Sequence, residues 1–424
     1  MEELSLRHAN ETLKAVVLAA GKGVRLWPLT ENRSKHMIPI AGKPIVEHVI
    51  SAIKSAGMRS LVVVTQYRSE LVKKHLGDGS KLGVRIEYVN QPDVSGTANA
   101  IHAAQNKIGN QDFLVAYGDL MVAPRAIKRV AETYRKKGRK PTVGLVPVSQ
   151  PELYGIAKVS GDFLTEILEK PSPSQSPGNL ANTGIYVLNS VVFDHLQSTL
   201  RSGRGEFEIT DTISSMAKGG TPVVSARIDP SDWQDIGRPW DILSANACLL
   251  ARSKRRIVGR IERGATVTGQ VTIEKGAVIR TGTVIEGPAW VGEDAIIGPL
   301  ARIRPGTSLG RGSAIGAFCE VKNSIIMDHT KMPHLSYVGD SIIGEHCNLA
   351  AGTIVANLKF SDRPVRMRVK DNLVDTGLRK LGIVTGDNVK TGINVSFMPG
   401  IRVASGATVP PGSIVSEDVM SPRA

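Results

Sequence analysis

The sequence is poor in aromatic residues, in cysteine and in long apolar runs. Only 4% of its 424 residues are Phe, Trp or Tyr, which argues against a stacking surface for single-stranded nucleic acid. The three cysteines, Cys248, Cys319 and Cys347, are widely spaced, so neither a disulfide framework nor a zinc site is expected. No stretch approaches the roughly 20 apolar residues of a membrane span, and residues 1–13 lack the apolar core of a signal peptide. We therefore expect a cytoplasmic protein without membrane or nucleic-acid partners.

The sequence is well supplied with hydrophobic residues, glycine and positive charge. Hydrophobic residues make up 41% of the chain, enough for a full core, and 43 glycines allow many tight turns. Fifty-three Lys and Arg residues against 39 Asp and Glu residues give a formal net charge of +14. Because aromatic residues are few, this excess points first to small anionic substrates. The length predicts two or three domains at roughly 150 residues each.

Strand-like and helical patterns alternate from Lys14 to about residue 250. A helix is expected after Lys43-Pro44, and the basic run 252–256 is expected to be the solvated end of a linker helix. Three apolar runs are typical of buried strands: 15–18, 61–65 and 113–117. The alternation predicts a Rossmann-like α/β domain with a mostly parallel sheet.

From Ile261 onward, branched aliphatic residues recur every six positions. Eleven stand in register: Ile261, Val267, Ile273, Ile279, Ile285, Val291, Ile297, Ile303, Leu309, Ile315 and Val321. Such residues make up roughly a fifth of an average chain, so chance would give this run on the order of once in tens of millions of trials. One inward aliphatic per hexad predicts a left-handed parallel β-helix with three short strands per coil.

The hexad period breaks twice. The breaks span 327–338 and about 359–380, and at each we expect a loop to leave the coils. Between and after them the period resumes at Ile343, Leu349 and Val355, and then at Ile383, Val389, Val395 and Ile401. The β-helix is therefore predicted to continue to the end of the chain.

An ordered set of polar motifs accompanies the α/β region. A glycine loop follows the first strand, and its backbone N–H groups can close on a phosphate beside Arg25. The later motifs are Ser34-Lys35-His36, Gln91, Ser95-Gly96-Thr97, Tyr117-Gly118-Asp119, Tyr154-Gly155, Glu169-Lys170-Pro171, Asn182-Thr183-Gly184 and Trp233-Gln234-Asp235. Taken singly, Asp119 is also compatible with a helix N-cap, and Lys35 is also compatible with a solvated surface lysine.

In this order, the motifs resemble those of the sugar-1-phosphate nucleotidylyltransferases. The hexad region resembles the acetyltransferase half of the bifunctional N-acetylglucosamine-1-phosphate uridylyltransferase/glucosamine-1-phosphate acetyltransferases, and the blocks 334–340 and 380–382 are most similar to the archaeal enzymes. The resemblance implies four segments: an N-terminal tail (1–13), a nucleotidyltransferase domain (14–247), a linker helix with a basic segment (248–260) and a β-helix acetyltransferase domain (261–424).

The resemblance also implies roles for the motifs of the first domain. Arg25 and Lys35 would hold a nucleoside triphosphate, and Asp119 and Asp235 would bind Mg²⁺. Joining two anions makes such catalysis mostly positioning and charge neutralisation. The nucleotide would be bound by Leu18, Ala20, Gly21, Gly23, Gln91, Gly96 and Thr97, and the sugar phosphate by Gly155, Glu169, Lys170, Asn182 and Thr183.

The second domain is expected to transfer an acetyl group. A sugar amine must lose a proton before it attacks the thioester of acetyl-CoA, so a base with a pKa of about 7 suits the reaction. By resemblance that base is His334, in the first loop expected to leave the coils. Other residues match positions for the substrate phosphate (Arg304 and Lys322) or for the sugar and acetyl group (Tyr337, Asn348 and Asn357). In the second loop, Arg363 and Arg366 stand where the family has lysines.

The leading interpretation is a bifunctional enzyme, a homotrimer by resemblance. It would acetylate glucosamine-1-phosphate, or also galactosamine-1-phosphate, and couple the product to UTP or dTTP with release of pyrophosphate. One alternative is a glucose-1-phosphate thymidylyltransferase whose β-helix only trimerises, but the acetyl-transfer residues argue against it. The other is a non-catalytic regulator similar to translation-initiation exchange-factor subunits, against which the phosphate and metal residues argue.

Overall fold

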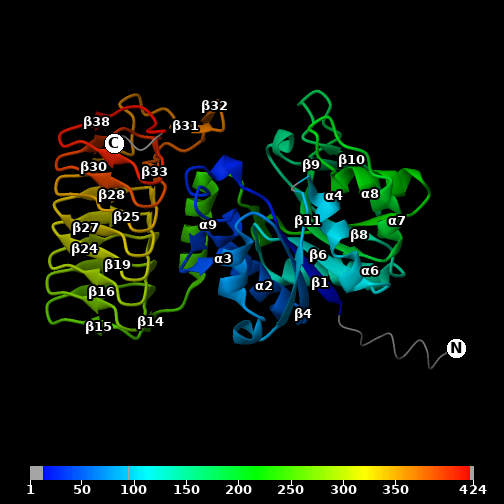
Figure 1. The fold of residues 1–424 in the computed structure, drawn as a ribbon, viewed down its shortest axis with the longest axis horizontal. Helices are drawn as coiled ribbons and strands as arrows, with labels where there is room; N and C mark the ends of the chain where they lie inside the picture. The colour runs from blue at the N-terminus through cyan, green and yellow to red at the C-terminus, as the bar shows by residue number, and fades with distance from the viewer. Residues whose placement is uncertain (1–12, 94, 421–424) are drawn as a thin grey trace. The chain divides into compact units, whose positions relative to one another are not determined.

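The computed structural model describes residues 13–93 and 95–420, and their contacts divide the chain into two units (Figure 1). The first unit holds the chain up to Lys22 together with Ile45–Asp235. The second unit holds Gly23–Pro44 together with the chain from Ile236 onward. The tail predicted for residues 1–13 lies outside the described residues except for Leu13. The four contiguous segments predicted from the sequence do not anticipate that Gly23–Pro44 packs with the second unit.

The first unit is built on a nine-stranded sheet in the order β5-β4-β1-β6-β11-β8-β12-β10-β9. Its strands are β1 (Lys14–Ala19), β4 (Ser60–Thr65), β5 (Arg85–Asn90), β6 (Phe113–Tyr117), β8 (Thr142–Pro147), β9 (Gly155–Ser160), β10 (Phe163–Glu169), β11 (Leu180–Leu188) and β12 (Val223–Arg227). Its helices are α2 (Ile45–Ser55), α3 (Ser69–Leu76), α4 (Thr97–Ala103), α5 (Gln105–Ile108), α6 (Pro124–Lys136), α7 (Val191–Gln197) and α8 (Ile209–Lys218). A two-stranded sheet pairs β7 (Leu120–Val122) with β13 (Trp233–Asp235).

The sheet of the first unit is parallel in one half and mixed in the other. The three predicted strands are β1, β4 and β6, and together with β5 they form the parallel half. The other half adds antiparallel pairs, because β9 and β10 are joined by a two-residue turn and must run in opposite directions. The helix predicted after Lys43-Pro44 is α2, and its buried face packs as the apolar pattern predicts.

The second unit is a parallel β-helix whose coils each present three short strands (Figure 1). One sheet holds β14 (Arg256–Ile257), β17 (Val271–Ile273), β20 (Ala289–Val291), β23 (Thr307–Leu309), β26 (Ile325–Ile326), β29 (Ile342–Ile343), β33 (Val384–Thr385) and β36 (Arg402–Val403). The second face holds β15 (Arg260–Ile261), β18 (Val278–Ile279), β21 (Ile296–Ile297), β24 (Ala314–Ala317) and β27 (Lys331–His334), then β34 (Lys390–Thr391) and β37 (Thr408–Val409). The third sheet holds β16 (Thr266–Thr268), β19 (Val284–Glu286), β22 (Arg302–Ile303), β25 (Glu320–Lys322), β28 (Tyr337–Gly339), β30 (Ile354–Val355), β35 (Ser396–Phe397) and β38 (Ile414–Val415).

The predicted hexad column forms the core of the β-helix. Nine of its eleven aliphatic residues are buried in one cluster, and Ile261 and Val267 pack against that cluster in the first coils. Ile279 pairs with Ile297, and Ile285 with Ile303, in the parallel register expected for coils of three hexads. The first parallel strand, β14, begins at Arg256, within the segment predicted as a linker.

The loop predicted at 327–338 is wrong, because the coils continue through that region. Met332 pairs with Ile315 in β24, and Val338 pairs with Val321 in β25. The turns that follow Val321 and Val338 are each one residue shorter than a full hexad, and Asn323 and Asp340 take positive φ angles of 44° and 52° there. Each short turn moves the next buried position one residue earlier in the sequence. A strict six-residue period therefore misses these positions, although the coils continue through them.

The second predicted break is confirmed as an insertion. The chain leaves the coils through an antiparallel bridge between Leu358 and Lys380, and it forms the hairpin β31 (Arg366–Val369) and β32 (Asn372–Asp375). Beyond it, Ile383 and Val389 are buried as predicted, but the ladder partners are Thr385 and Thr391, two residues further on. Earlier coils place alanine at the first of these two positions and isoleucine two residues later, as in Ala277 and Ile279. Here a bulky aliphatic stands at the first position and threonine at the second, so the core stays filled.

Helix α9 (Pro239–Arg252) and the segment Gly23–Pro44 complete the second unit. The segment contains two short 3-10 turns, Val24–Leu26 and Lys35–Met37, and the paired strands β2 (Pro39–Ile40) and β3 (Lys43–Pro44). The predicted linker helix is thus the end of α9, which stops at Arg252. Throughout the described ranges, no helix is long and apolar enough to cross a membrane, and all three cysteines are free thiols.

Two neighbouring isoleucines of β21 test the role of the hexad column. Ile297 is fully buried, whereas Ile296 is 40% exposed. We expect Ile297→Ala to lower the free energy of unfolding by about 2–5 kcal/mol, because it leaves a cavity that rigid coils cannot close. The matched Ile296→Ala change should cost less than about 1 kcal/mol. Urea unfolding followed by circular dichroism measures both, and equal losses would contradict the assigned register.

Candidate active sites

The first candidate site lies where parallel strands of the first unit end. Leu18 and Ala20 lie at the end of β1, Gln91 follows β5, and Asp119 lies in the turn between β6 and β7. The Gly118 N–H donates to the carbonyl oxygen of Leu18 at 2.8 Å, which ties two of these loops together. The carboxyl edge of an open α/β sheet is where such folds bind ligands.

The structure brings three of the predicted nucleotide-binding residues, Gln91, Gly96 and Thr97, close together along the chain. Gln91 is buried, and its amide donates to the Gly96 carbonyl oxygen at 3.1 Å. Gly96 has a φ of 119°, and a Cβ atom there would lie 2.3 Å from the carbonyl oxygen of Phe207, so only glycine fits. Thr97 begins α4, and its hydroxyl accepts a hydrogen bond from the Ile209 N–H at 3.0 Å.

The two predicted metal ligands lie at one end of a pair of strands, β7 and β13. Asp235 ends β13 opposite Leu120 of β7, and Asp119 directly precedes Leu120. A strand follows Asp119, so the N-cap alternative is excluded. Within the described residues, no group of three or more His, Cys, Asp or Glu side chains forms a metal-binding cluster. Two carboxylates with water completing the shell fit Mg²⁺ rather than a transition metal.

The predicted sugar residues Gly155 and Glu169 pair across β9 and β10. A Cβ atom on Gly155 would lie 2.7 Å from Oε2 of Glu169, so glycine makes room for this carboxylate. Lys170 Nζ lies 3.6 Å from Oε1 of Glu169, and Arg204 reaches the same oxygen at 3.4 Å. Arg204 belongs to none of the predicted motifs, because nothing in the sequence links it to Glu169, 35 positions earlier. It adds a second cation to the predicted sugar-phosphate site.

Acidic residues from the loop before α8 and from α8 itself surround Arg204. Its guanidinium lies 2.5 Å from Oε1 of Glu208. Burial raises the pKa of Glu208, and also that of Asp211. This part of the site therefore holds cations and partly desolvated carboxyl groups side by side, an arrangement that suits a ligand with both hydroxyl and phosphate groups.

Asn182 and Thr183 lie on β11 and connect the sugar residues to the metal pair. The Asn182 amide donates to the Tyr186 hydroxyl at 2.6 Å, and the Thr183 hydroxyl donates to the carbonyl oxygen of Gly144 at 2.8 Å. The Trp233 indole N–H donates to the Thr183 carbonyl oxygen at 2.8 Å. Because Trp233 begins the strand that ends in Asp235, this bond links β11 to a predicted metal ligand.

Arg25 and Lys35 belong to the second unit. They lie in the two 3-10 turns of Gly23–Pro44. Gly23 has a φ of 68°, and a Cβ atom on it would lie 2.7 Å from the Cβ atom of Lys35, so the two turns are in contact. Val24, which stands where the family commonly has Thr or Ser, is 52% exposed.

The second candidate site lies on the third sheet of the β-helix and centres on Asp340, which is buried. Lys322 Nζ lies 3.1 Å from its carboxylate, and the Asn357 amide donates to it and, at 3.3 Å, to the Tyr337 hydroxyl. Arg304 pairs with Glu320 at 2.9 Å in the coils beside them. Neither Asp340 nor Glu320 was predicted as a site residue, although Asp340 ends the block 334–340.

His334 and Asn348 lie on the second face of the β-helix. His334 ends β27 opposite Ala317, which corrects its predicted place in a loop that leaves the coils. Asn348 bridges Lys331 and Lys390. Both side chains are exposed. The corner formed by residues 335–336 separates His334 from Tyr337, so the predicted acetyl-transfer residues occupy two adjacent faces within one chain.

Comparison with known proteins identifies the family of this chain. A family model described as Nucleotidyl transferase matches residues 14–252, and one described as GMPPB C-terminal domain matches residues 285–423. Bifunctional protein GlmU of Methanococcus vannielii is 42% identical over 412 residues, which cover 96% of each chain. The chain belongs to the GlmU family. It is therefore a bifunctional nucleotidyltransferase and acetyltransferase, as predicted.

Other relatives of this GlmU-family chain cover its whole length or its first unit. A bifunctional sugar-1-phosphate nucleotidylyltransferase/acetyltransferase of Sulfurisphaera tokodaii is 39% identical over 411 residues, which cover 96% of this chain and 98% of the relative. The crystal structure of a putative glucose-1-phosphate thymidylyltransferase from Bacillus anthracis matches with a TM-score of 0.50 and 31% identity, over 56% of this chain and 94% of that one. A UDP-glucose pyrophosphorylase complexed with UDP-glucose matches with a TM-score of 0.51 at 24% identity, over 57% of this chain and 100% of that one, and supports the fold alone.

The close approach of Gly155 to Glu169 can be tested by adding one methyl group. Gly155→Ala should push the Glu169 carboxylate aside and raise the KM for the sugar phosphate by about tenfold, because a 1 Å misplacement is costly in a preorganised site. The KM for the nucleotide should change less than about twofold. Lys158→Ala, at an exposed position of the same strand β9, is the control. An unchanged sugar-phosphate KM would remove Glu169 from the site.

Proposed function

We propose that this GlmU-family enzyme acetylates glucosamine-1-phosphate with acetyl-CoA and then transfers UMP from UTP to N-acetylglucosamine-1-phosphate, releasing pyrophosphate. One observation carries the proposal: a single chain holds both residue sets. Asp235 ends β13 and Asp119 directly precedes β7, the strand paired with β13, and Lys322, Tyr337 and Asn357 gather around Asp340. The free cysteines fit the cytoplasmic location that we also propose.

In the nucleotidyl transfer, positive side chains would neutralise two anions that must approach each other. Arg25 and Lys35 would hold the triphosphate, and Lys170 together with Arg204 would hold the sugar phosphate. Asp119 and Asp235 would hold Mg²⁺, which supplies additional positive charge when bound. An oxygen of the sugar phosphate then attacks the α-phosphorus, and the bond to pyrophosphate breaks.

In the acetyl transfer, His334 would take a proton from the 2-ammonium group of the sugar. The freed amine attacks the thioester carbonyl, and amide or phenol donors such as Asn357 and Tyr337 would stabilise the oxyanion. The CoA thiolate leaves as the carbonyl re-forms, and the second proton lost by the nitrogen passes to that thiolate. Arg304 and Lys322 would bind the substrate phosphate, and Asp340 would hold Lys322 and Asn357 in position.

We also propose a homotrimer. His334 and Tyr337 lie on either side of a corner of the β-helix, and this corner presents three apolar side chains that are 50–62% exposed: Leu300, Phe318 and Leu335. Each has a positive φ angle, and adjacent coils stack these corner residues above one another. A neighbouring β-helix packed on these three side chains would bury them. It would also supply further side chains to contact CoA beside His334.

Removing either predicted metal ligand should abolish only the nucleotidyl transfer. We expect Asp119→Asn and Asp235→Asn to slow pyrophosphate release from UTP and N-acetylglucosamine-1-phosphate by at least about 100-fold, since the charge they hold stabilises the transition state. Acetyl transfer by the same preparations should be unchanged. Asp162→Asn, which removes an exposed partner of Lys137, is the control. Normal pyrophosphate release in either aspartate variant would refute the metal assignment.

Loss of the proposed base should abolish only acetyl transfer. His334→Ala should slow CoA release from acetyl-CoA and glucosamine-1-phosphate by at least about 100-fold, because a positioned base contributes roughly that much. His329→Ala removes another exposed histidine of the coils and should be silent. Release as fast as in the unmodified enzyme would refute the role of His334. The same assay with galactosamine-1-phosphate, and the pyrophosphate assay with dTTP in place of UTP, define the substrate range.

A further inference from the structure

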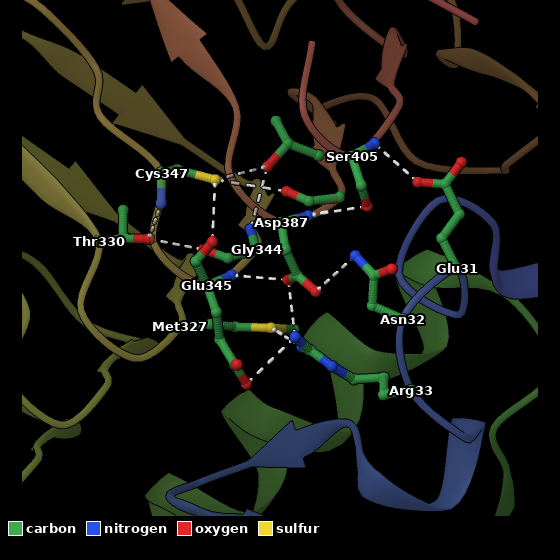
Figure 2. A network of polar contacts seen from close by, with 12 residues as sticks. Glu31, Asn32, Arg33, Met327, Thr330, Gly344, Glu345, Cys347, Asp387 and Ser405 are labelled. Carbon is green, nitrogen blue, oxygen red and sulfur yellow. Dashed lines mark hydrogen bonds and ion pairs between the residues drawn. The ribbon is translucent and has the colours of Figure 1, made fainter. Parts of the chain in front are cut away.

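The segment Gly23–Pro44 is held by an ion pair that joins it to the late coils of the β-helix (Figure 2). The side chain of Arg33 is only 6% exposed, and one of its nitrogens lies 2.6 Å from Oδ1 of Asp387 and 3.1 Å from Oε1 of Glu345. Its other terminal nitrogen donates to the sulfur of Met327 at 2.8 Å. A buried guanidinium with these partners has one favourable position, because any displacement leaves a charge unpaired.

Neighbouring residues of the segment add further contacts to the same coils (Figure 2). The Asn32 amide donates to Oδ2 of Asp387 at 3.3 Å. One carboxylate oxygen of Glu31 accepts from the Ser405 N–H at 2.6 Å, and the other accepts from the indole N–H of Trp27 at 2.6 Å. The backbone N–H of Asp387 donates to the Ser405 hydroxyl at 3.0 Å, so the two contact points on the β-helix are themselves joined.

The far end of the segment is fixed by a buried amide. Asn246 of α9 accepts from the Ala41 N–H at 2.9 Å, while its own NH₂ group donates to the carbonyl oxygen of Gly306 at 2.9 Å. Gly42 lies against the ring of Trp290, where a Cβ atom would come within 2.4 Å. The segment is thus held in its middle and near its C-terminal end by residues of the second unit.

Of the two proposed triphosphate residues, Lys35 lies between these anchors and Arg25 lies just before the first of them. Lys35 follows Arg33 by two residues, and Arg25 precedes Trp27 by two residues. The Trp27 ring also lies under the guanidinium of Arg402, 4.7 Å from it. A single residue separates Arg33 from Lys35 and Trp27 from Arg25. A displacement of Arg33 or Trp27 is therefore expected to displace Lys35 or Arg25 as well.

We infer that Arg33 and Asp387 are positioning residues for nucleotidyl transfer. Through them, late coils of the acetyltransferase half set the position of Arg25 and Lys35 and thereby the efficiency of the other reaction. The inference rests on the proposed role of Arg25 and Lys35 in holding the triphosphate.

The test uses the full-length enzyme with Arg33→Gln or Asp387→Asn, changes that remove one charge and keep the approximate shape. Each variant should lower kcat/KM for UTP by at least about tenfold, because the phosphate-holding groups shift. The KM for the sugar phosphate and the rate of acetyl transfer should stay within about twofold. Arg33→Lys keeps the charge and should recover part of the loss.

Two further variants separate this role from a general loss of fold. Glu293→Gln breaks an ion pair with Arg311 made within the coils and should change neither reaction. Equal loss of both reactions in Asp387→Asn, or unchanged UTP kinetics, would overturn the inference. If a buried substitution prevents folding, Glu31→Gln supplies the same measurement from a partly exposed position.

Lys35→Ala distinguishes this inference from the function on which it rests. If Lys35→Ala leaves the UTP kinetics unchanged, the proposed role of the segment fails. If Lys35→Ala lowers them while Arg33→Gln and Asp387→Asn do not, only the positioning role is rejected.

Discussion

The core of the β-helix depends on one requirement: each hexad must place an aliphatic side chain in the narrow interior that the three sheets enclose. Strands of two or three residues have little stability alone, so they persist because parallel pairing stacks residues such as Ile279 and Ile297 in a single column. Most of the other side chains of a coil point outward. The outer faces can therefore carry charge and polar groups without disturbing the core, and both His334 and Asp387 come from coils built in this way.

The buried polar groups of the second unit serve a different purpose from its aliphatic core. Arg33 and Asn246 are almost completely buried, and burying such groups gives little net stability even when they are well paired. Their directional contacts instead select one arrangement of the segment Gly23–Pro44 against α9 and the coils. A purely apolar surface would hold the segment with less directional control, whereas phosphate chemistry needs its cations in fixed places.

Much of the architecture follows from periodic patterns, and the exceptions have physical causes. The strands β1, β4 and β6, helix α2 and the hexad column up to Val321 were predictable because burial repeats at the period of each structure. The short turns at Asn323 and Asp340 could not be found, because losing one residue changes the count without changing the fold. They misplaced His334, although its identity as a candidate did not depend on that placement.

The site residues divide in the same way. Motifs identified Asp119, Asp235 and Glu169 because each belongs to an ordered block of the sequence. Arg204, Asp340 and Arg33 are single residues whose meaning comes from partners elsewhere in the chain, and for Arg33 the partner Asp387 is more than 350 positions away. No local pattern in the sequence encodes such a pair, so only the folded structure reveals it.

The contact between Glu31 and Ser405 also orders the enzyme's maturation in time. At roughly 5–20 residues per second of synthesis, Ser405 is made roughly 20–75 seconds after Glu31. The first half of the chain therefore leaves the ribosome before the coils that contact its segment Gly23–Pro44 have been made. That segment acquires its partners Asp387 and Ser405 only when almost the whole chain has been synthesised.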